Sequence, residues 1–279
     1  MTRRSVDLAT ELGESFYLPP CGLSLDILGT LKNSAGLQLH PRHTTPRQDG
    51  ALLNIVSTGY VACGGHSGDA VVMAQTIHEL VAMGKAIGAH PSYPDIFGFG
   101  QVTPSNLDND QLFSVLVSQL GSVCALAKAA GTQIQAVKCH GALAFDVAYK
   151  PEVTITMARA MLQVDSSMAL VIFAGSKGIE AACGCGIRVI REAYVDRRYD
   201  INGRILNRKL PGALIVDAKE AVEQAISIIL RGRVLAEDGE WIDLAADSLC
   251  LHADTPGSRT IAEKLQVALS EACIVVKAA

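Results

Sequence analysis

The chain has 279 residues, of which 49% are hydrophobic, 19% charged and 5% aromatic. With 24 Lys and Arg against 28 Asp and Glu, the formal net charge is −4. The basic surplus expected of a protein that binds nucleic acid or anionic lipid is therefore missing. High apolar content with low net charge also excludes a disordered chain. The composition predicts one α/β domain over residues 1–279.

The N-terminus and the cysteines predict a cytoplasmic protein. Residues 1–5 are basic but run directly into Val6-Asp7-Leu8, without the apolar core of a secretory leader. The longest uninterrupted apolar stretch, Ala169–Ala174, is too short to span a bilayer. Eight cysteines in a chain of this length need not form disulfides. We expect reduced thiols, with Cys183-Gly184-Cys185 in the core because its spacing is not that of a redox or zinc pair.

Short apolar runs alternate along the chain with longer segments of helical period. In chain order, the predicted strands are Val6–Thr10, Tyr60–Cys63, Ala86–Ala89, Ile134–Lys138, Leu170–Ala174, Arg188–Glu192 and Ser248–Leu251. The predicted helices lie at about residues 69–84, 106–131, 151–163, 218–230 and 257–271. Continuous apolar strands separated by helices are typical of a parallel sheet covered on both faces. Seven such units predict a (β/α) barrel, seven-stranded and distorted relative to the TIM barrel.

Residues 17–50 interrupt this alternation. The segment is long for a connection between a strand and a helix, and we expect a surface insertion or lid. Its His40 and His43 are a candidate metal pair. An exposed polar loop is the favoured interpretation, because Pro41 lies between them and no carboxylate is near.

Histidines and acids gather where the predicted strands end. His66, His90, His140 and His252 stand at, or a few residues after, the ends of four strands. Because the carboxyl ends of parallel barrel strands converge on one rim, this spacing predicts a shared polar site. The candidate catalytic residues are His66, His90, His140, Lys138, Asp7, Glu11 and Asp196. If the site holds a metal, its candidate ligands are Asp7, Glu11, His66 and His90.

Two residues at the predicted rim, Lys138 and Asp69, have more than one interpretation. Lys138 is costly to bury without an anionic partner, which an active-site acid, a phosphate or a substrate carboxylate would each provide. Asp69 is as well placed to cap the following helix as to serve the site.

Six blocks of this sequence, in the right order, resemble the LamB/YcsF family, whose members are also called lactam utilization proteins or the A-subunit of 5-oxoprolinase. Residues 7–16, DLATELGESF, are similar to the family's DLNCDLGESF. The other blocks are residues 62–69 (ACGGHSGD), 88–95 (GAHPSYPD), 137–143 (VKCHGAL), 196–199 (DRRY) and 249–256 (LCLHADTP). The likeness covers nearly the whole chain outside residues 17–50.

The resemblance implies a barrel akin to those of glycoside hydrolases and deacetylases. It also implies ATP-dependent opening of the lactam 5-oxoproline to glutamate, with Mg²⁺ and partner subunits; a homo-oligomer stays open. In that activity, His66, His90 or His140 would activate water or move protons, and Lys138 and Arg197 would stabilise phosphoryl or carboxylate charge. The substrate- and nucleotide-binding residues that it implies are Asp69, Tyr93, Arg197, Tyr199, Arg208, His252 and Asp254.

The sequence departs from the family pattern at positions expected to line the pocket. Ala9 and Glu11 replace Asn and Asp, Gln101-Val102 replaces an Arg pair, and Ala144-Phe145 replaces Tyr-Asn; the other departures are Cys139, Asn207 and Ala253. Each donor lost from a dry site costs on the order of 1–3 kcal/mol in binding or catalysis. Two alternatives therefore stay open: a barrel with weakened catalysis that binds a small ligand or partner, and a metal-dependent amide hydrolase or deacetylase.

Overall fold

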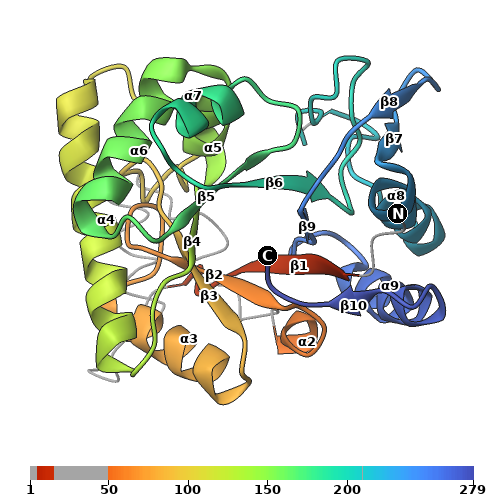
Figure 1. Cartoon of the computed structure of the whole chain (residues 1–279), viewed down its shortest axis with the longest axis horizontal. Coiled ribbons are helices and arrows are strands. Elements are labelled where there is room, and N and C mark those ends of the chain that lie inside the picture. Colours follow the sequence, from red (N-terminus) through yellow and green to blue (C-terminus); the bar gives the residue numbers. More distant parts are fainter. Residues whose placement is uncertain (1–4, 16–49, 209) are drawn as a thin grey trace, which may run out of the picture.

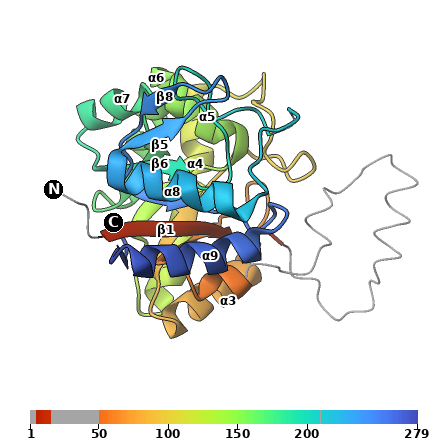
Figure 2. The ribbon, with the colours of Figure 1, turned by 90° about the vertical axis from the view of Figure 1, so that its right-hand side faces the viewer.

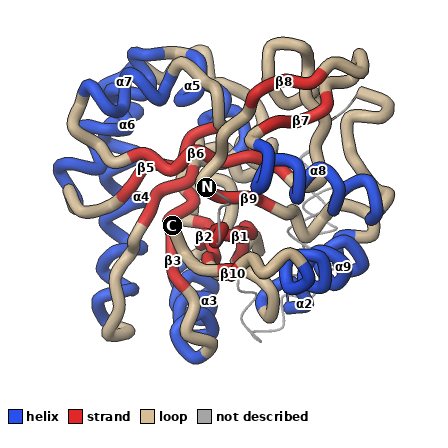
Figure 3. Tube along the Cα trace, turned by 45° about the vertical axis from the view of Figure 1, so that its right-hand side comes forward, coloured by secondary structure: helices blue, strands red, loops and turns tan. Residues whose placement is uncertain are grey.

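Seven parallel strands close into a barrel at the centre of the molecule (Figures 1 and 3). The computed structural model describes residues 5–15, 50–208 and 210–279. The barrel strands are β1 (Ser5–Leu12), β2 (Thr58–Ala62), β3 (Ala86–His90), β4 (Ala136–Lys138), β5 (Ala169–Phe173), β6 (Val189–Tyr194) and β9 (Ser248–Cys250). Each strand pairs in parallel with the next, and β9 pairs with both β6 and β1. This confirms the predicted seven-stranded (β/α) barrel and all seven predicted strands.

Helices cover the outside of the barrel. They are α2 (Gly50–Leu53), α3 (Ala70–Ala82), α4 (Asn109–Ala129), α5 (Gly141–Tyr149), α6 (Pro151–Val164), α7 (Gly178–Gly184), α8 (Ala218–Arg231) and α9 (Ser258–Glu271). The five predicted helices correspond to α3, α4, α6, α8 and α9. Helices α8 and α9 pack on each other, and in the view of Figure 2 β1 is seen between them. The predicted insertion at residues 17–50, with His40 and His43, lies outside the described residues except for its last position.

Local signals explain where the main helices begin and end. The Asp69 carboxylate accepts hydrogen bonds from the backbone N–H groups of Val71 and Val72 at 2.9 and 3.0 Å, which caps α3. Asp108 and Gln111 form a capping box at the start of α4. Gly232, with φ of +63°, ends α8 in the left-handed conformation that glycine adopts most easily.

Apolar side chains fill the barrel below its rim. A small cluster of Ala9, Tyr60, Ala136, Ala169, Val171 and Ile190 is separate from the main core, which lies between the strands and the helices. Tyr60 has no exposed surface, and a Cβ at Gly88 would lie 2.2 Å from its ring. Glycine at position 88 therefore makes room for the tyrosine ring. These apolar side chains form a floor beneath the rim, where barrel proteins carry their active sites.

The remaining described elements lie at the margins of the barrel. Strands β7 (Arg233–Leu235) and β8 (Trp241–Asp243) form an antiparallel hairpin, and β10 (Val275–Val276) pairs with the start of β1. Among the described helices, α4 is long and apolar enough to cross a membrane by length and composition. Its buried face, which includes Leu112, Leu116 and Leu120, packs within the domain, as expected of a core helix.

The cysteines of the described ranges are free thiols, as predicted. The expectation that Cys183 and Cys185 are core residues is wrong. Cys183 is exposed and Cys185 only partly buried, because they close the short helix α7 on the outside of the barrel.

Candidate functional site at the carboxyl rim of the barrel

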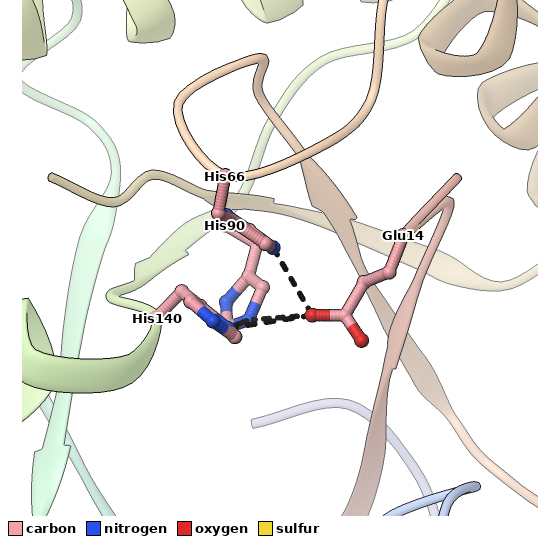
Figure 4. Close-up of side chains that lie close together, drawn as sticks. All are labelled: Glu14, His66, His90 and His140. Carbon is pink, nitrogen blue, oxygen red and sulfur yellow. Dashed lines mark hydrogen bonds and ion pairs between the residues drawn. The ribbon is translucent and has the colours of Figure 1, made fainter. Parts of the chain in front are cut away.

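One carboxylate and three imidazoles meet at the rim (Figure 4). Glu14 follows β1, His66 follows β2, His90 is the last residue of β3, and His140 precedes α5. Glu14 Oε1 lies 3.0 Å from His66 Nε2, 3.3 Å from His140 Nδ1 and 3.9 Å from His90 Nε2. His90 Nε2 and His140 Nδ1 are 3.1 Å apart. We call these four side chains the histidine cluster.

Backbone carbonyls orient two of the imidazoles. His90 Nδ1 lies 2.7 Å from the carbonyl oxygen of Lys138, and His140 Nε2 lies 2.8 Å from that of Phe99. A carbonyl oxygen only accepts, so these two ring nitrogens carry protons and donate. Burial, reinforced by His66, holds the pKa of His140 well below its usual value. His140 is therefore a neutral imidazole at pH 7, with its unprotonated Nδ1 facing His90.

Lys138 lies beside the histidine cluster, inside the barrel. Its Nζ is 2.9 Å from Glu192, 3.2 Å from Glu11 and 3.0 Å from the Cys250 thiol. Burial alone would lower the pKa of Lys138, but Cys250, Glu192 and Glu11 hold it well above its usual value. Burial would likewise raise the pKa of Glu11, but Lys138 and His90 keep it well below the usual range. The partner that Lys138 requires is thus a pair of protein carboxylates.

A second acid–imidazole pair stands across the rim. His252 Nδ1 is 3.0 Å from both carboxylate oxygens of Asp196, and Thr255 donates its hydroxyl to the same carboxylate. Burial alone would raise the pKa of Asp196, but His252 and Thr255 hold it below its usual value. The Tyr194 ring stacks on His252 with 5.3 Å between centroids. The imidazole is therefore held from two sides, by the fully buried Asp196 carboxylate and by Tyr194.

A cleft of about 870 Å³ opens between these groups. His140 and Glu11 line one part of it, and His252, Arg208 and Asp254 another. Its apolar wall includes Phe145, Phe173, Tyr194 and Ile205. Arg208 pairs with Asp254 at 2.6 Å, and Arg197 donates to the carbonyl oxygen of Leu206. The volume and the mixed lining suit a small polar organic molecule.

The structure brings most of the predicted site residues to the rim, but four lie elsewhere. Asp7 accepts hydrogen bonds from Ser57, Thr58 and Ser248 near the opposite end of the barrel. Asp7 and Glu11 share one face of β1, yet four residues of strand separate them by about 13 Å. Asp7 therefore cannot share a metal ion with Glu11, His66 and His90. The other three residues, Asp69, Tyr93 and Tyr199, are not among those that line the cleft.

Tyr93 and Tyr199 make hydrogen bonds inside the fold. Tyr93 donates to Asp146 at 2.8 Å, and the Tyr199 hydroxyl accepts from the backbone N–H of Tyr194 at 2.8 Å. Both rings are 3% exposed, which leaves them inaccessible to a ligand in the cleft. Asp69 was predicted either to cap the following helix or to serve the site, and in the structure it caps α3.

Two acids of the site were not among the predicted residues. Glu192 is the last residue of the predicted strand Arg188–Glu192, so its place at a strand end was the available signal, although nothing local indicates that it faces Lys138. Glu14 follows the predicted first strand, and Gly13, with φ of +71°, turns the chain there. Glu14 lies three residues after Glu11 in the block DLATELGESF, and that position was the signal from which it could have been predicted as a site residue.

The fold and this rim define a (β/α)-barrel protein with an acid- and histidine-lined cleft. The LamB/YcsF family profile matches residues 41–279. The 5-oxoprolinase A-subunit of Methylococcus capsulatus is 36% identical over 275 residues, 99% of this chain and 96% of that protein. The one from Chloroflexus aggregans is 40% identical over 82% of this chain and 90% of its own. The chain belongs to the LamB/YcsF family.

A solved structure extends this similarity to three dimensions. The lactam utilization protein from Thermus thermophilus superposes with a TM-score of 0.83 at 30% sequence identity. The superposition covers 99% of this chain and all of that one. The barrel fold is therefore shared with that protein.

Proposed function

We propose that this protein is the lactam-binding subunit of a 5-oxoprolinase-type hydrolase, which opens 5-oxoproline to glutamate. The observation that carries the proposal is the rim cleft, where two separate imidazole sites, the histidine cluster and the Asp196–His252 pair, border one cavity. Hydrolysis of an amide needs water activated on one side and a proton delivered to the leaving nitrogen on the other. The family and the names of its relatives give the substrate class.

The cleft has groups that complement each part of 5-oxoproline. The substrate is a five-membered lactam that carries one carboxylate. Arg208, at the edge of the cleft, is placed to pair with that carboxylate in exchange for Asp254. The rings of Phe145, Phe173 and Tyr194 offer an apolar wall to the methylene groups. The lactam carbonyl would then face His140 and the remainder of the histidine cluster.

In this proposal the two imidazole sites have different tasks. Water held at the histidine cluster adds to the lactam carbonyl carbon, and the ring C–N bond breaks. His252, whose Nδ1–H is directed at Asp196, delivers a proton from Nε2 to the leaving nitrogen in its imidazolium form, and the proton released by the attacking water restores it. Lys138 fixes Glu11 and Glu192 and positions them, and Glu11 in turn lies 3.6 Å from His90. Water contributes a hydroxyl to the new carboxylate and a hydrogen to the new amine.

ATP with Mg²⁺ is implied by the family resemblance, and we propose that its phosphates are held by a partner protein of the complex. Lys138, Arg197 and Arg208 are the cationic candidates near the cleft, and each already contacts an oxygen of this chain. Around Lys138 two carboxylates oppose one ammonium, a surrounding that repels phosphate. These residues do not fit a nucleotide, so we derive no step through it. Free thiols and ATP coupling both suit a protein of the cytoplasm.

The departures from the family pattern support a second candidate, hydrolysis of a different and more apolar cyclic amide. Gln101, Val102, Ala144 and Phe145, which replace an Arg pair and Tyr-Asn, all line the cleft. Each replacement removes polar groups or adds apolar surface where a ligand would lie. A barrel that binds such a ligand without turnover fits the same observation.

The decisive experiment measures glutamate and phosphate release from 5-oxoproline and Mg-ATP, first with the purified protein and then with candidate partner subunits. Glutamate formed only with partners supports the proposed role. No glutamate under any combination, from protein shown to be folded by circular dichroism, refutes 5-oxoproline as the substrate. A panel of larger lactams, tested under the same conditions, then separates a different substrate from a barrel that only binds.

A further inference from the structure

We propose that the histidine cluster is a binding site for one divalent transition-metal ion, with Glu14 Oε1, His66 Nε2, His90 Nε2 and His140 Nδ1 as ligands. Their ligand atoms all lie within 4.8 Å of one another. Zinc–nitrogen and zinc–oxygen bonds of about 2.0–2.2 Å place tetrahedral ligands about 3.4 Å apart. Four of the distances between pairs of these ligand atoms are 3.0, 3.1, 3.3 and 3.9 Å, which scatter around that value.

Backbone carbonyls orient two of the histidines so that their remaining ring nitrogens face each other. His90 donates through Nδ1 to the Lys138 carbonyl, and His140 donates through Nε2 to the Phe99 carbonyl. Their other nitrogens, His90 Nε2 and His140 Nδ1, then face each other at 3.1 Å. A proton on one of them can bridge this gap, and so can a metal ion, which would bind both nitrogens. A carbonyl on the distal nitrogen is the usual arrangement for a metal-binding histidine.

The surrounding packing orders the three rings, and the stacked pair His66 and His140 would have to tilt apart for both to bind one ion. His66 stacks on His140 with 3.6 Å between ring centroids and a 4° angle between planes, and Phe99 meets both rings edge-on. His66 and His90 are fully buried and His140 is 5% exposed. The Glu14 carboxylate beside these imidazoles favours a cation. Three nitrogens and one oxygen favour zinc or a neighbouring transition metal over Mg²⁺ or Ca²⁺.

A second group of metal-binding side chains at the rim is a poorer site. Glu11, Cys250 and His252 also place their ligand atoms within 4.8 Å of one another. The Lys138 ammonium, however, lies 3.2 Å from Glu11 and 3.0 Å from Cys250. A cation already occupies that space, and a second one would be repelled. Of the two groups, only the histidine cluster can take a metal ion without displacing a charged side chain.

The position of the site gives it a use in the proposed reaction. His140 lines the cleft, so an ion bound to it stands at the cleft wall. To hold and acidify the attacking water, a metal there would have to accept the water as a fifth ligand, a role that rests on the proposed function. Metal binding itself rests only on the cluster geometry and can be tested without a substrate.

The test is metal binding by the purified chain without a polyhistidine tag. The protein is stripped with a chelator and dialysed against Zn²⁺, and bound metal is counted by elemental analysis; Co²⁺ titration then follows the visible absorption of the site. The variants are His90→Ala and the isosteric Glu14→Gln. The matched control is His78→Ala, because His78 is an exposed histidine of α3 away from the cluster.

We expect one equivalent of metal in the wild type and in His78→Ala, and at least a tenfold loss of affinity in His90→Ala and Glu14→Gln. If His90→Ala does not fold, Glu14→Gln decides, since it keeps the side-chain volume. The proposal is overturned if the wild type binds less than half an equivalent, or if both cluster variants bind as the wild type does. Neither result depends on 5-oxoproline, so each leaves the proposed function to its own assay.

Discussion

Replacing Lys138 with Met should destabilise the protein, because it removes the cation that compensates a buried pair of carboxylates. Lys138 is 3% exposed, with Glu192 at 2.9 Å and Glu11 at 3.2 Å. At an effective dielectric constant of about 20, each contact is worth about 5 kcal/mol of attraction before desolvation is subtracted. Methionine keeps most of the volume, so the loss is electrostatic. Breaking a buried pair by removing one partner costs about 3–5 kcal/mol, and we expect that range here.

The assay is denaturant unfolding followed by circular dichroism, together with thermal melting. For a chain of this length the expected loss lowers Tm by about 5–9 °C. Since burial raises the pKa of Glu192, the uncompensated carboxylate takes up a proton at low pH. The loss of stability in Lys138→Met should therefore be larger at about pH 8 than at about pH 5.

Two further variants separate this network from a general effect of losing a lysine. Adding Glu192→Gln to Lys138→Met removes one of the opposed carboxylates and should restore about 1–2 kcal/mol. Lys128→Met, on the exposed face of α4, should change stability by less than about 0.5 kcal/mol. A Lys138→Met protein as stable as Lys128→Met at both pH values would refute the buried ion network.

Three smaller perturbations test other assignments. Tyr93→Phe removes a buried hydrogen bond to Asp146 and should cost about 1–3 kcal/mol of unfolding free energy while leaving ligand affinity unchanged; weaker ligand binding without loss of stability would place Tyr93 in the site after all. Asp69→Ala removes the α3 cap and should cost about 1 kcal/mol, measured by urea unfolding; no change would show that the cap contributes nothing. The lowered pKa of Asp196 contributes stability above the unfolded-state pKa near about 4, and this is lost as pH falls through the folded-state pKa. Asp196→Asn should therefore flatten the dependence of stability on pH below about pH 4, and parallel wild-type and variant curves would contradict the assignment.

The barrel was predictable because its signals are local. Each strand is a short apolar run, and caps such as Asp69 and Asp217 mark where helices begin. Helices α2, α5 and α7 were missed because all three are short, and α5 begins directly after His140 with no side-chain cap. The apolar pattern that predicts longer helices has too few turns to emerge there.

The site was predictable only as far as strand ends define it. His66, His90 and His140 follow three strands in succession, so their convergence follows from the parallel topology alone. Depth along a strand is harder to predict: Asp7 and Glu11 have the same parity on β1, but only Glu11 reaches the rim. Glu192 also ends a predicted strand, but its pairing with Lys138 could not be predicted, since Lys138 stands on β4 and no periodicity links the two.

The barrel closes where β1 pairs with β9 and β10, a seam that has a consequence for biosynthesis. Strand β1 pairs with β2 on one side, but its other neighbours are β9 and β10, more than 230 positions later in the chain. On the ribosome, one edge of β1 thus stays unpaired until almost the whole polypeptide has emerged. Glu11 and His252, which border the same cleft, come from the two sides of this seam. The cleft therefore cannot form before β9 has been synthesised and has paired with β1, so a shorter nascent chain has no complete substrate site.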